Sequence, residues 1–179
     1  MALIERGEAK FNIAVSGGAR QGIHYWTQDL SYLACRTPED EVLFQVLIGG
    51  TQGQTPHLGW HLPVLFRADQ VVQATRALLD LFRTQGCREK RDQARLRYLV
   101  ERIGIGGVLA YLEEHLDFPL RPCVSAPSPP SGYDELIGWF RQKQPNLWAM
   151  GLCVPLGRLS WQQLEALAVL AKKWGDGSL

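Results

Sequence analysis

Residues 10–18 read KFNIAVSGG, and the organisation of the chain follows from this stretch. β-branched and aromatic residues that run into a pair of glycines predict a strand. Because strand side chains alternate between two faces, Lys10 and Asn12 are expected on the same face. The opposite face, expected to enter a core, carries Phe11, Ile13 and Val15. An ammonium beside an amide offers donors suited to a small anion. The alternative interpretation is an edge strand whose polar face is only solvated.

Composition limits the classes of function. The chain has 179 residues, 46% of them hydrophobic, which suffices for one large domain or two small ones. Its 19 basic and 18 acidic residues leave a net charge of +1, which argues against a nucleic-acid or membrane-surface binder. No apolar run approaches the ~20 residues of a membrane span. Since residues 1–8 lack the apolar core of a signal peptide, we expect a cytoplasmic protein.

Two further strands are expected over residues 29–35 and 42–50, and the charged turn 36–41 joins them into an antiparallel hairpin. The second strand is almost continuously apolar, which is typical of burial on both faces. It runs into the loop GGTQGQTP at residues 49–56. Glycines there would let backbone N–H groups approach an anion. The spacing matches neither a P-loop nor a dinucleotide fingerprint, and it also fits a plain flexible turn.

Apolar periodicity predicts helices over residues 69–85, 88–103 and 105–115, with Gly86 and Gly104 as stops. The second helix has a basic face formed by Arg88, Lys90, Arg91, Arg95, Arg97 and Arg102. Acidic residues interrupt it, so it is either a solvated surface of ion pairs or a docking patch for an acidic partner.

The stretch 117–132 is rich in proline and serine and is expected to link two domains without forming a packed element. After it, residues 147–155 are expected to form a strand. Ser160 then opens a helix, with Gln163 completing a capping box.

Metal and disulfide chemistry has little support in the sequence. The cysteines are Cys35, Cys87, Cys123 and Cys153. Their wide spacing favours free thiols over disulfides. His57 and His61 have the spacing of metal ligands on a helix, but Gly59 and Pro63 argue against a helix there, and no metal site is expected.

Three segments resemble the ferredoxin-dependent nitrite and sulfite reductases, which couple sirohaem to a [4Fe–4S] cluster. They are KFNIAVSG at 10–17, FQVLIGG at 44–50 and GLCVPLGRL at 151–159. In that family the lysine and the residue two positions on face the sirohaem and contact the substrate oxyanion. The resemblance therefore implies catalytic roles for Lys10 and Asn12. Lys-x-Asn is similar to the nitrite-reducing version, whereas Lys-x-Lys marks the sulfite-reducing one.

The resemblance also implies a cofactor and partners. The residues expected to contact sirohaem are Lys10, Asn12, Gly17, Arg20, Gly49 and Gly50. The family's cluster ligands come as C-x5-C and C-x3-C pairs, which do not occur here, so a [4Fe–4S] cluster is expected only in the complete enzyme. Ferredoxin would be the electron donor and nitrite or sulfite the substrate, with no role for nucleic acid or membrane.

The expected fold class is α+β. A mixed or antiparallel sheet with helices on one face would form a sirohaem-binding domain at residues 9–116. The linker would cover 117–132, and part of a ferredoxin-like half-domain 133–179. Because exposed sheet edges invite pairing, that unfinished half-domain can also form a homodimer.

The resemblance implies a fragment or shortened relative of a ferredoxin-dependent nitrite reductase, an enzyme of nitrate assimilation that reduces nitrite to ammonia with six electrons. We expect the chain alone to be inactive. The alternatives are a sulfite reductase fragment and a non-catalytic module that binds sirohaem or ferredoxin. In a phototrophic eukaryote the compartment would be the plastid stroma.

Overall fold

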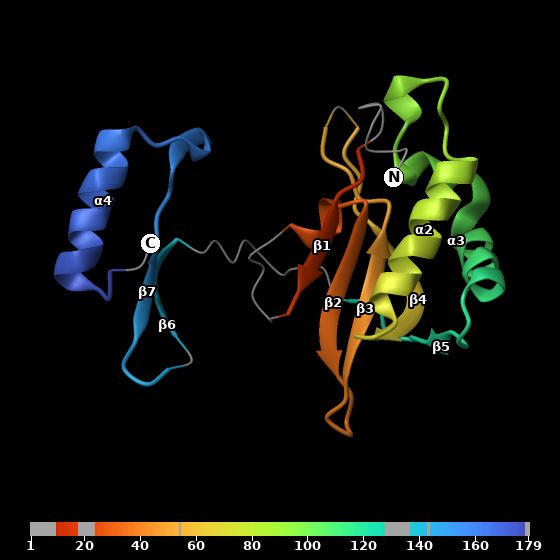
Figure 1. Ribbon diagram of the computed structural model, residues 1–179, viewed down its shortest axis with the longest axis horizontal. Coiled ribbons are helices and arrows are strands. Elements are labelled where there is room, and N and C mark those ends of the chain that lie inside the picture. The colour runs from red at the N-terminus through yellow and green to blue at the C-terminus, as the bar shows by residue number, and fades with distance from the viewer. Residues whose placement is uncertain (1–9, 18–23, 54, 128–136, 143, 178–179) are drawn as a thin grey trace. The chain divides into compact units, whose positions relative to one another are not determined.

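The chain folds into two compact units that divide between Asp134 and Glu135. The computed structural model describes residues 10–17, 24–53, 55–127, 137–142 and 144–177. Within these residues the first unit has a five-stranded sheet and two α-helices, and the second has a two-stranded sheet and one α-helix (Figure 1).

The sheet of the first unit is mixed. Its strands lie side by side in the order β1 (Ile13–Ser16), β2 (Leu30–Arg36), β3 (Val42–Ile48), β4 (Trp60–Arg67) and β5 (Arg121–Pro122). β1 runs parallel to β2, and the other neighbouring pairs are antiparallel. The predicted hairpin is confirmed as β2–β3.

Helices α2 (Val71–Gln85) and α3 (Leu96–His115) cover one face of this sheet (Figure 1). Their apolar side chains and those of β2, β3 and β4 form a single buried core. Gly104, with a φ of 70°, divides α3 at the predicted position. The α+β class, with helices on one face of a mixed sheet, is thus confirmed. The second helix begins later than predicted, because Arg95 adopts an extended conformation (φ −132°, ψ 150°) and serves as its N-cap.

Ile13 and Val15 of β1 pair with the core residues Leu30 and Tyr32, but the predicted burial of this face is only partly confirmed. Phe11 does pack on the core, with its ring centroid 5.7 Å from that of Phe82. Ile13 and Val15, however, are 47% and 58% exposed, whereas Ala14 and Ser16 are buried. β1 is an edge strand, and the helices pack over β2–β4, so the apolar face of β1 remains uncovered. Its small side chains lie instead on the face that the 3-10 turn Tyr25–Thr27 covers.

Strand β4 was not predicted, because Pro63 interrupts its apolar pattern. The pairing of β3 with β4 shifts register between Gln45 and Val46, opposite Pro63. Such a bulge accommodates a residue that lacks a backbone N–H. The carbonyl of Pro63 then accepts a hydrogen bond of 2.9 Å from the N–H of Cys123.

The expectation that residues 117–132 form no packed element is wrong for their first part. β5 pairs with the edge of β4, and Cys123 is buried. The ring of Phe118 lies edge-on to that of Phe66, with 6.2 Å between centroids. The apolar residues among the prolines therefore extend the first unit beyond α3.

The second unit consists of the hairpin β6 (Gly138–Arg141) and β7 (Trp148–Gly151), a 3-10 turn (Pro155–Gly157) and helix α4 (Trp161–Trp174). The predicted capping box is confirmed: the Ser160 hydroxyl accepts from the N–H of Gln163, and the Gln163 side chain accepts from the N–H of Ser160. No residue of α4 is buried. Large apolar side chains left exposed in this unit include Trp139, Leu147, Trp148, Met150, Trp161, Leu164, Leu170 and Trp174.

A titratable group in the core gives a test of the packing. Tyr32 is fully buried on β2, and its hydroxyl lies 2.8 Å from Oγ1 of Thr75 on α2. Burial raises the pKa of Tyr32 to about 12, against an opposing contribution from the Thr75 hydrogen bond. The native pKa thus lies above the unfolded value of about 10, so stability is complete below about pH 10 and falls as the pH rises toward about 12.

We expect wild-type protein to lose up to about 2.7 kcal/mol over this interval, since one pKa unit corresponds to about 1.4 kcal/mol. Tyr32→Phe should remove that part of the decline. Urea denaturation at several alkaline pH values measures it, with Tyr98→Phe as the control for a partly exposed tyrosine. An identical decline in wild type and Tyr32→Phe would contradict this prediction.

Candidate functional site

The candidate anion-binding side chains lie on the segment that leads into β1. Both Lys10 and Asn12 are exposed, while Phe11 between them is partly buried against the core. No ion pair or hydrogen bond joins the Lys10 ammonium to another described residue. The backbone of Asn12 is fixed at both polar groups: its N–H donates to Oδ2 of Asp29 (2.9 Å), and its carbonyl accepts from the N–H of Leu30 (3.1 Å). Two side chains are thus presented to solvent on an anchored backbone.

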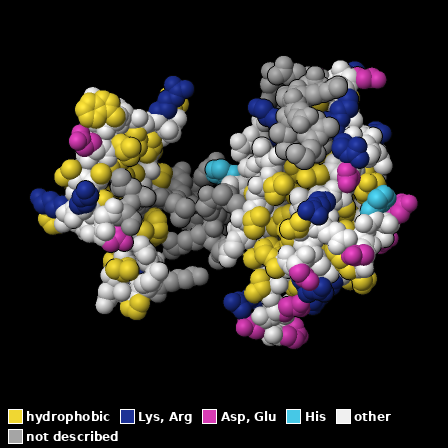
Figure 2. Space-filling model, in the orientation of Figure 1, with side chains coloured by type: hydrophobic (Ala, Val, Ile, Leu, Met, Phe, Trp, Pro, Cys, Tyr) yellow, Lys and Arg dark blue, Asp and Glu magenta, His cyan; other side chains and the backbone are white. Residues whose placement is uncertain are grey.

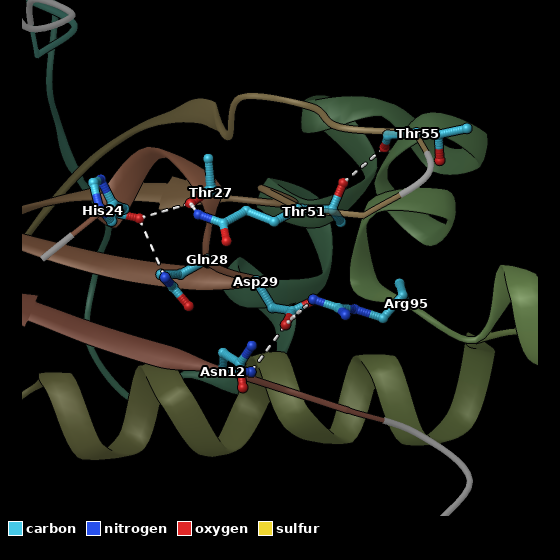
Figure 3. Close-up of polar contacts among 9 residues, drawn as sticks. Asn12, His24, Thr27, Gln28, Asp29, Thr51, Thr55 and Arg95 are labelled. Atoms are coloured by element: carbon cyan, nitrogen blue, oxygen red, sulfur yellow. Dashed lines mark hydrogen bonds and ion pairs between the residues drawn. The ribbon is translucent and has the colours of Figure 1, made fainter. Parts of the chain in front are cut away.

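The anchor is the carboxylate of Asp29, which is completely buried. Arg95 donates to it from both Nε (3.0 Å to Oδ1) and Nη2 (2.8 Å to Oδ2), as Figure 3 shows. Together with the Asn12 N–H, the carboxylate accepts three hydrogen bonds. A buried charge needs such partners, because desolvation of an unpaired carboxylate is costly.

Sequence reasoning missed this pair. It placed Arg95 on a basic helix face and gave Asp29 no role. An aspartate at the start of an apolar strand was the available signal, since acidic residues are almost never buried unless they are paired.

The glycine-rich loop is shaped mainly by internal packing. A Cβ on Gly50 would lie 2.4 Å from the carbonyl oxygen of Trp26, and one on Gly49 would lie 2.6 Å from the ring of Trp60. The N–H of Gly49 donates to the carbonyl of Asp29 at 2.8 Å, so it is not available to an anion. Gly17 is exposed, with nothing within 4 Å of its Cβ position. Arg20 lies outside the described residues.

Polar side chains also connect the rest of the glycine-rich loop to the 3-10 turn before β2 (Figure 3). Gln52 Nε2 donates to Oγ1 of Thr27 at 2.7 Å, and Oγ1 of Thr51 donates to the carbonyl of Thr55 at 3.2 Å. The carbonyl of His24 accepts from the Thr27 hydroxyl (3.0 Å). These contacts hold the loop beside the segment that the Asp29 carboxylate anchors.

His57 and His61 follow this loop: His57 forms a bridge with Thr51, and His61 lies in β4. The ring of His57 lies on that of Trp60, with 4.0 Å between centroids, and burial lowers the pKa of His61. His57 Nδ1, His61 Nε2 and Trp26 Nε1 are buried without a hydrogen-bond partner in the described part of the chain. No group of three or more His, Cys, Asp or Glu among the described residues is placed to hold a metal ion.

A hollow of about 250 Å³ lies elsewhere, at the other end of β3. Arg67 and Arg121 line it, and each is paired with a carboxylate: Arg67 with Asp69 at 3.0 Å and Arg121 with Glu41 at 2.7 Å. The hollow includes none of the candidate site residues.

With this geometry established, comparison with known proteins gives the family. The model for the nitrite and sulphite reductase 4Fe-4S domain matches residues 6–120. That is well over half of the chain. The protein belongs to the nitrite and sulfite reductase family. The model for the nitrite/sulfite reductase ferredoxin-like half domain matches residues 140–179, within the second unit.

Relatives of both substrate types align with almost the whole chain. The ferredoxin–nitrite reductases of Synechococcus elongatus and Leptolyngbya laminosa are 35% and 31% identical over 95% of this chain. A sulfite reductase [NADPH] hemoprotein beta-component from Chromohalobacter salexigens is 30% identical over 84% of it. The solved structure of the NirA protein of Mycobacterium tuberculosis has a TM-score of 0.81 and 28% identity, and covers 94% of this chain. The chain spans about a third of its curated nitrite reductase relatives, 33% of each of the two compared.

The cysteines of this family member do not fit an iron–sulfur cluster. All four are free. Cys123 is buried, with Sγ contacting Gln45 and the carbonyl of Ser125. A cluster needs several thiolates around one position, and the described residues contain no such group.

Sirohaem, the other group that the family implies, fits in part. Its carboxylates require cations, and Lys10 supplies one that is exposed, two positions from Asn12. Most of the arginines expected to form a basic face are engaged within the first unit. Arg97 pairs with Glu101, Arg102 donates to the Gln85 carbonyl, and Arg88 donates to the Phe82 carbonyl. Lys10 is therefore the residue that would hold a carboxylate of the ring.

No helix in the described part of the chain has both the length and the apolar character that a membrane crossing requires.

The close packing at Gly50 generates a stability prediction. Gly50→Ala should destabilise the protein by about 1–3 kcal/mol, because the new methyl group would press on the Trp26 carbonyl and force the loop to shift. Gly106→Ala is the matched control: nothing lies within 4 Å of its Cβ position in α3, and alanine should stabilise that helix by about 0.5–1 kcal/mol. Urea denaturation measures both, and a Gly50→Ala variant as stable as wild type would refute the packing described here.

Proposed function

We propose that this chain forms one wall of the sirohaem and oxyanion site of a ferredoxin-dependent nitrite reductase. The observation that carries the proposal is the pair of exposed side chains, Lys10 and Asn12, on a backbone fixed by Phe11 and Asp29. The Lys10 ammonium would stabilise the bound anion and give protons to the departing oxygen. The Asn12 amide would donate a hydrogen bond to the same anion. Sirohaem would bind the substrate, and the [4Fe–4S] cluster of the complete enzyme would supply electrons from ferredoxin.

Nitrite is favoured over sulfite as the substrate. Lys10-x-Asn12 is similar to the nitrite-reducing motif, and two of the relatives above 30% identity carry ferredoxin–nitrite reductase in their names. A sulfite reductase part is the second candidate, supported by relatives of that name. A non-catalytic module that binds sirohaem or ferredoxin is the third. A cytoplasmic or a plastid location accords with each candidate, and the name of a ferredoxin–nitrite reductase from Spinacia oleracea includes the word chloroplastic.

Titration of the purified chain with sirohaem, followed by nitrite or sulfite, tests the proposal. We expect a saturable change in the absorption of sirohaem, and then a nitrite-dependent shift. Lys10→Met should weaken the binding of nitrite about 10- to 100-fold, because a hydrogen bond to a charged group contributes about 1.5–3 kcal/mol of binding free energy. Lys90→Met, at an exposed lysine of the same unit, is the control and should change nothing.

In the same preparation, reduced viologen and nitrite should yield no ammonia, because the chain lacks cluster ligands. Failure of the wild-type chain to bind sirohaem, or equal nitrite affinity in wild type and Lys10→Met, would overturn the proposed site. Turnover would overturn the proposed inactivity.

We also propose that two copies associate through the second unit. In the β6–β7 hairpin Trp139 pairs with Met150 and Arg141 with Trp148, so Trp139, Trp148 and Met150 share one exposed face. Two strands and one helix bury too little apolar surface to be stable alone.

Sedimentation velocity at rising protein concentration should show dimers in wild type and monomers in Trp148→Arg. Val124→Arg, at a fully exposed residue of the first unit, is the matched control and should still dimerise. Wild type that stays monomeric throughout would contradict the association.

A further inference from the structure

The buried ion pair between Asp29 and Arg95 has features that stability alone does not explain. Asp29 is 0% exposed and the Arg95 side chain 22%. Replacing such a pair by apolar residues often leaves stability unchanged or raises it. Its three hydrogen bonds nevertheless join three places in the chain: Asn12 before β1 donates one, Arg95 at the N-cap of α3 donates two, and Asp29, just before β2, accepts all three (Figure 3).

The geometry connects this pair to the candidate site residues. Asp29 Oδ2 accepts the N–H of Asn12, and the neighbouring Leu30 N–H donates to the Asn12 carbonyl. The carbonyl of Asp29 also accepts the N–H of Gly49, at the start of the glycine-rich loop. One residue therefore fixes the backbone of both segments from which the family resemblance implies cofactor contacts.

Arg95 fixes Asp29 in turn. Its planar guanidinium group donates two parallel hydrogen bonds to the carboxylate and so sets the orientation of both oxygens. In that orientation Oδ2 accepts from both Arg95 Nη2 and the N–H of Asn12. Arg95 is the N-cap of α3, so the position of its guanidinium group depends on the packed helix.

We propose that Asp29 and Arg95 are positioning residues for the oxyanion site. They set the backbone of Asn12, and with it the joint presentation of the Lys10 ammonium and the Asn12 amide to the anion. This inference rests on the proposed function. Apart from the bidentate Arg67–Asp69 pair at an exposed surface, the other ion pairs in the described residues are single contacts, and none of them touches the Lys10–Asn12 segment.

The decisive variant replaces both partners, Asp29→Leu with Arg95→Met. It leaves no unpaired buried charge, so we expect it to fold with near wild-type stability. It nevertheless removes the acceptor for the Asn12 N–H. Asp29→Asn is the second variant; it keeps the shape of Asp29 but leaves Arg95 without its charged partner. The matched control is the exposed pair on α2, Asp80→Leu with Arg83→Met, whose side chains are 57% and 54% exposed.

Two readouts separate positioning from stability. The first is amide hydrogen exchange of Asn12 by NMR, with the Leu47 amide in β3 as the reference for global opening. In the Asp29→Leu/Arg95→Met variant, amide exchange at Asn12 should accelerate about 10- to 100-fold, while the exchange rate of the Leu47 amide should change little. The second is nitrite affinity of the sirohaem-loaded chain, which should fall about 10-fold. The Asp80→Leu/Arg83→Met control should alter neither.

The outcomes distinguish the two proposals. If the wild-type chain binds no nitrite with sirohaem, the proposed function fails, and the exchange rates still decide whether Asp29 fixes Asn12. If wild type binds nitrite and the double variant binds it equally well, positioning is overturned while the proposed function stands. Exchange at Asn12 that stays unchanged, or that rises only in step with Leu47, also overturns positioning. If Asp29→Asn fails to fold, the double variant supplies the result.

Discussion

A single buried carboxylate joins the parts of the first unit that matter for its chemistry. Asp29 accepts hydrogen bonds from the segment before β1 and from the residue that begins α3. Its backbone carbonyl also holds the loop after β3. In a family whose cofactor carries out the redox chemistry, the protein chiefly contributes orientation and charge. Under the proposed function, a connection between an anchored peptide and a packed helix would provide such orientation, because it fixes the backbone that carries the donor side chains.

Much of the fold was predictable because it follows from local patterns. The hairpin β2–β3, the stop at Gly86, the break at Gly104 and the capping box at Ser160 each depend on a few neighbouring residues. Features that depend on distant partners were missed. β4 contains Pro63, which only a bulge against β3 can accommodate. Ile13 and Val15 were expected to be buried, but β1 is an edge strand that the helices do not cover, and strand alternation does not indicate where a strand lies in its sheet.

The same division holds for the candidate site. Lys10 and Asn12 could be singled out from a motif of three residues, and the structure places both at the surface of the first unit. The Asp29–Arg95 pair spans 66 positions in the sequence, so no local pattern indicates it. The glycines at 49 and 50 were interpreted either as an approach to an anion or as a plain flexible turn, whereas their contacts show a nearer cause in the ring of Trp60 and the backbone of Trp26.

The central claim is that the Lys10 ammonium and the Asn12 amide bind one oxyanion. The most direct measurement is a crystal structure of the chain loaded with sirohaem and nitrite. The account predicts Lys10 Nζ and Asn12 Nδ2 both within about 3 Å of nitrite oxygens, with the Asn12 N–H still bonded to Asp29. A nitrite bound elsewhere, with both side chains remaining in solvent, would contradict it.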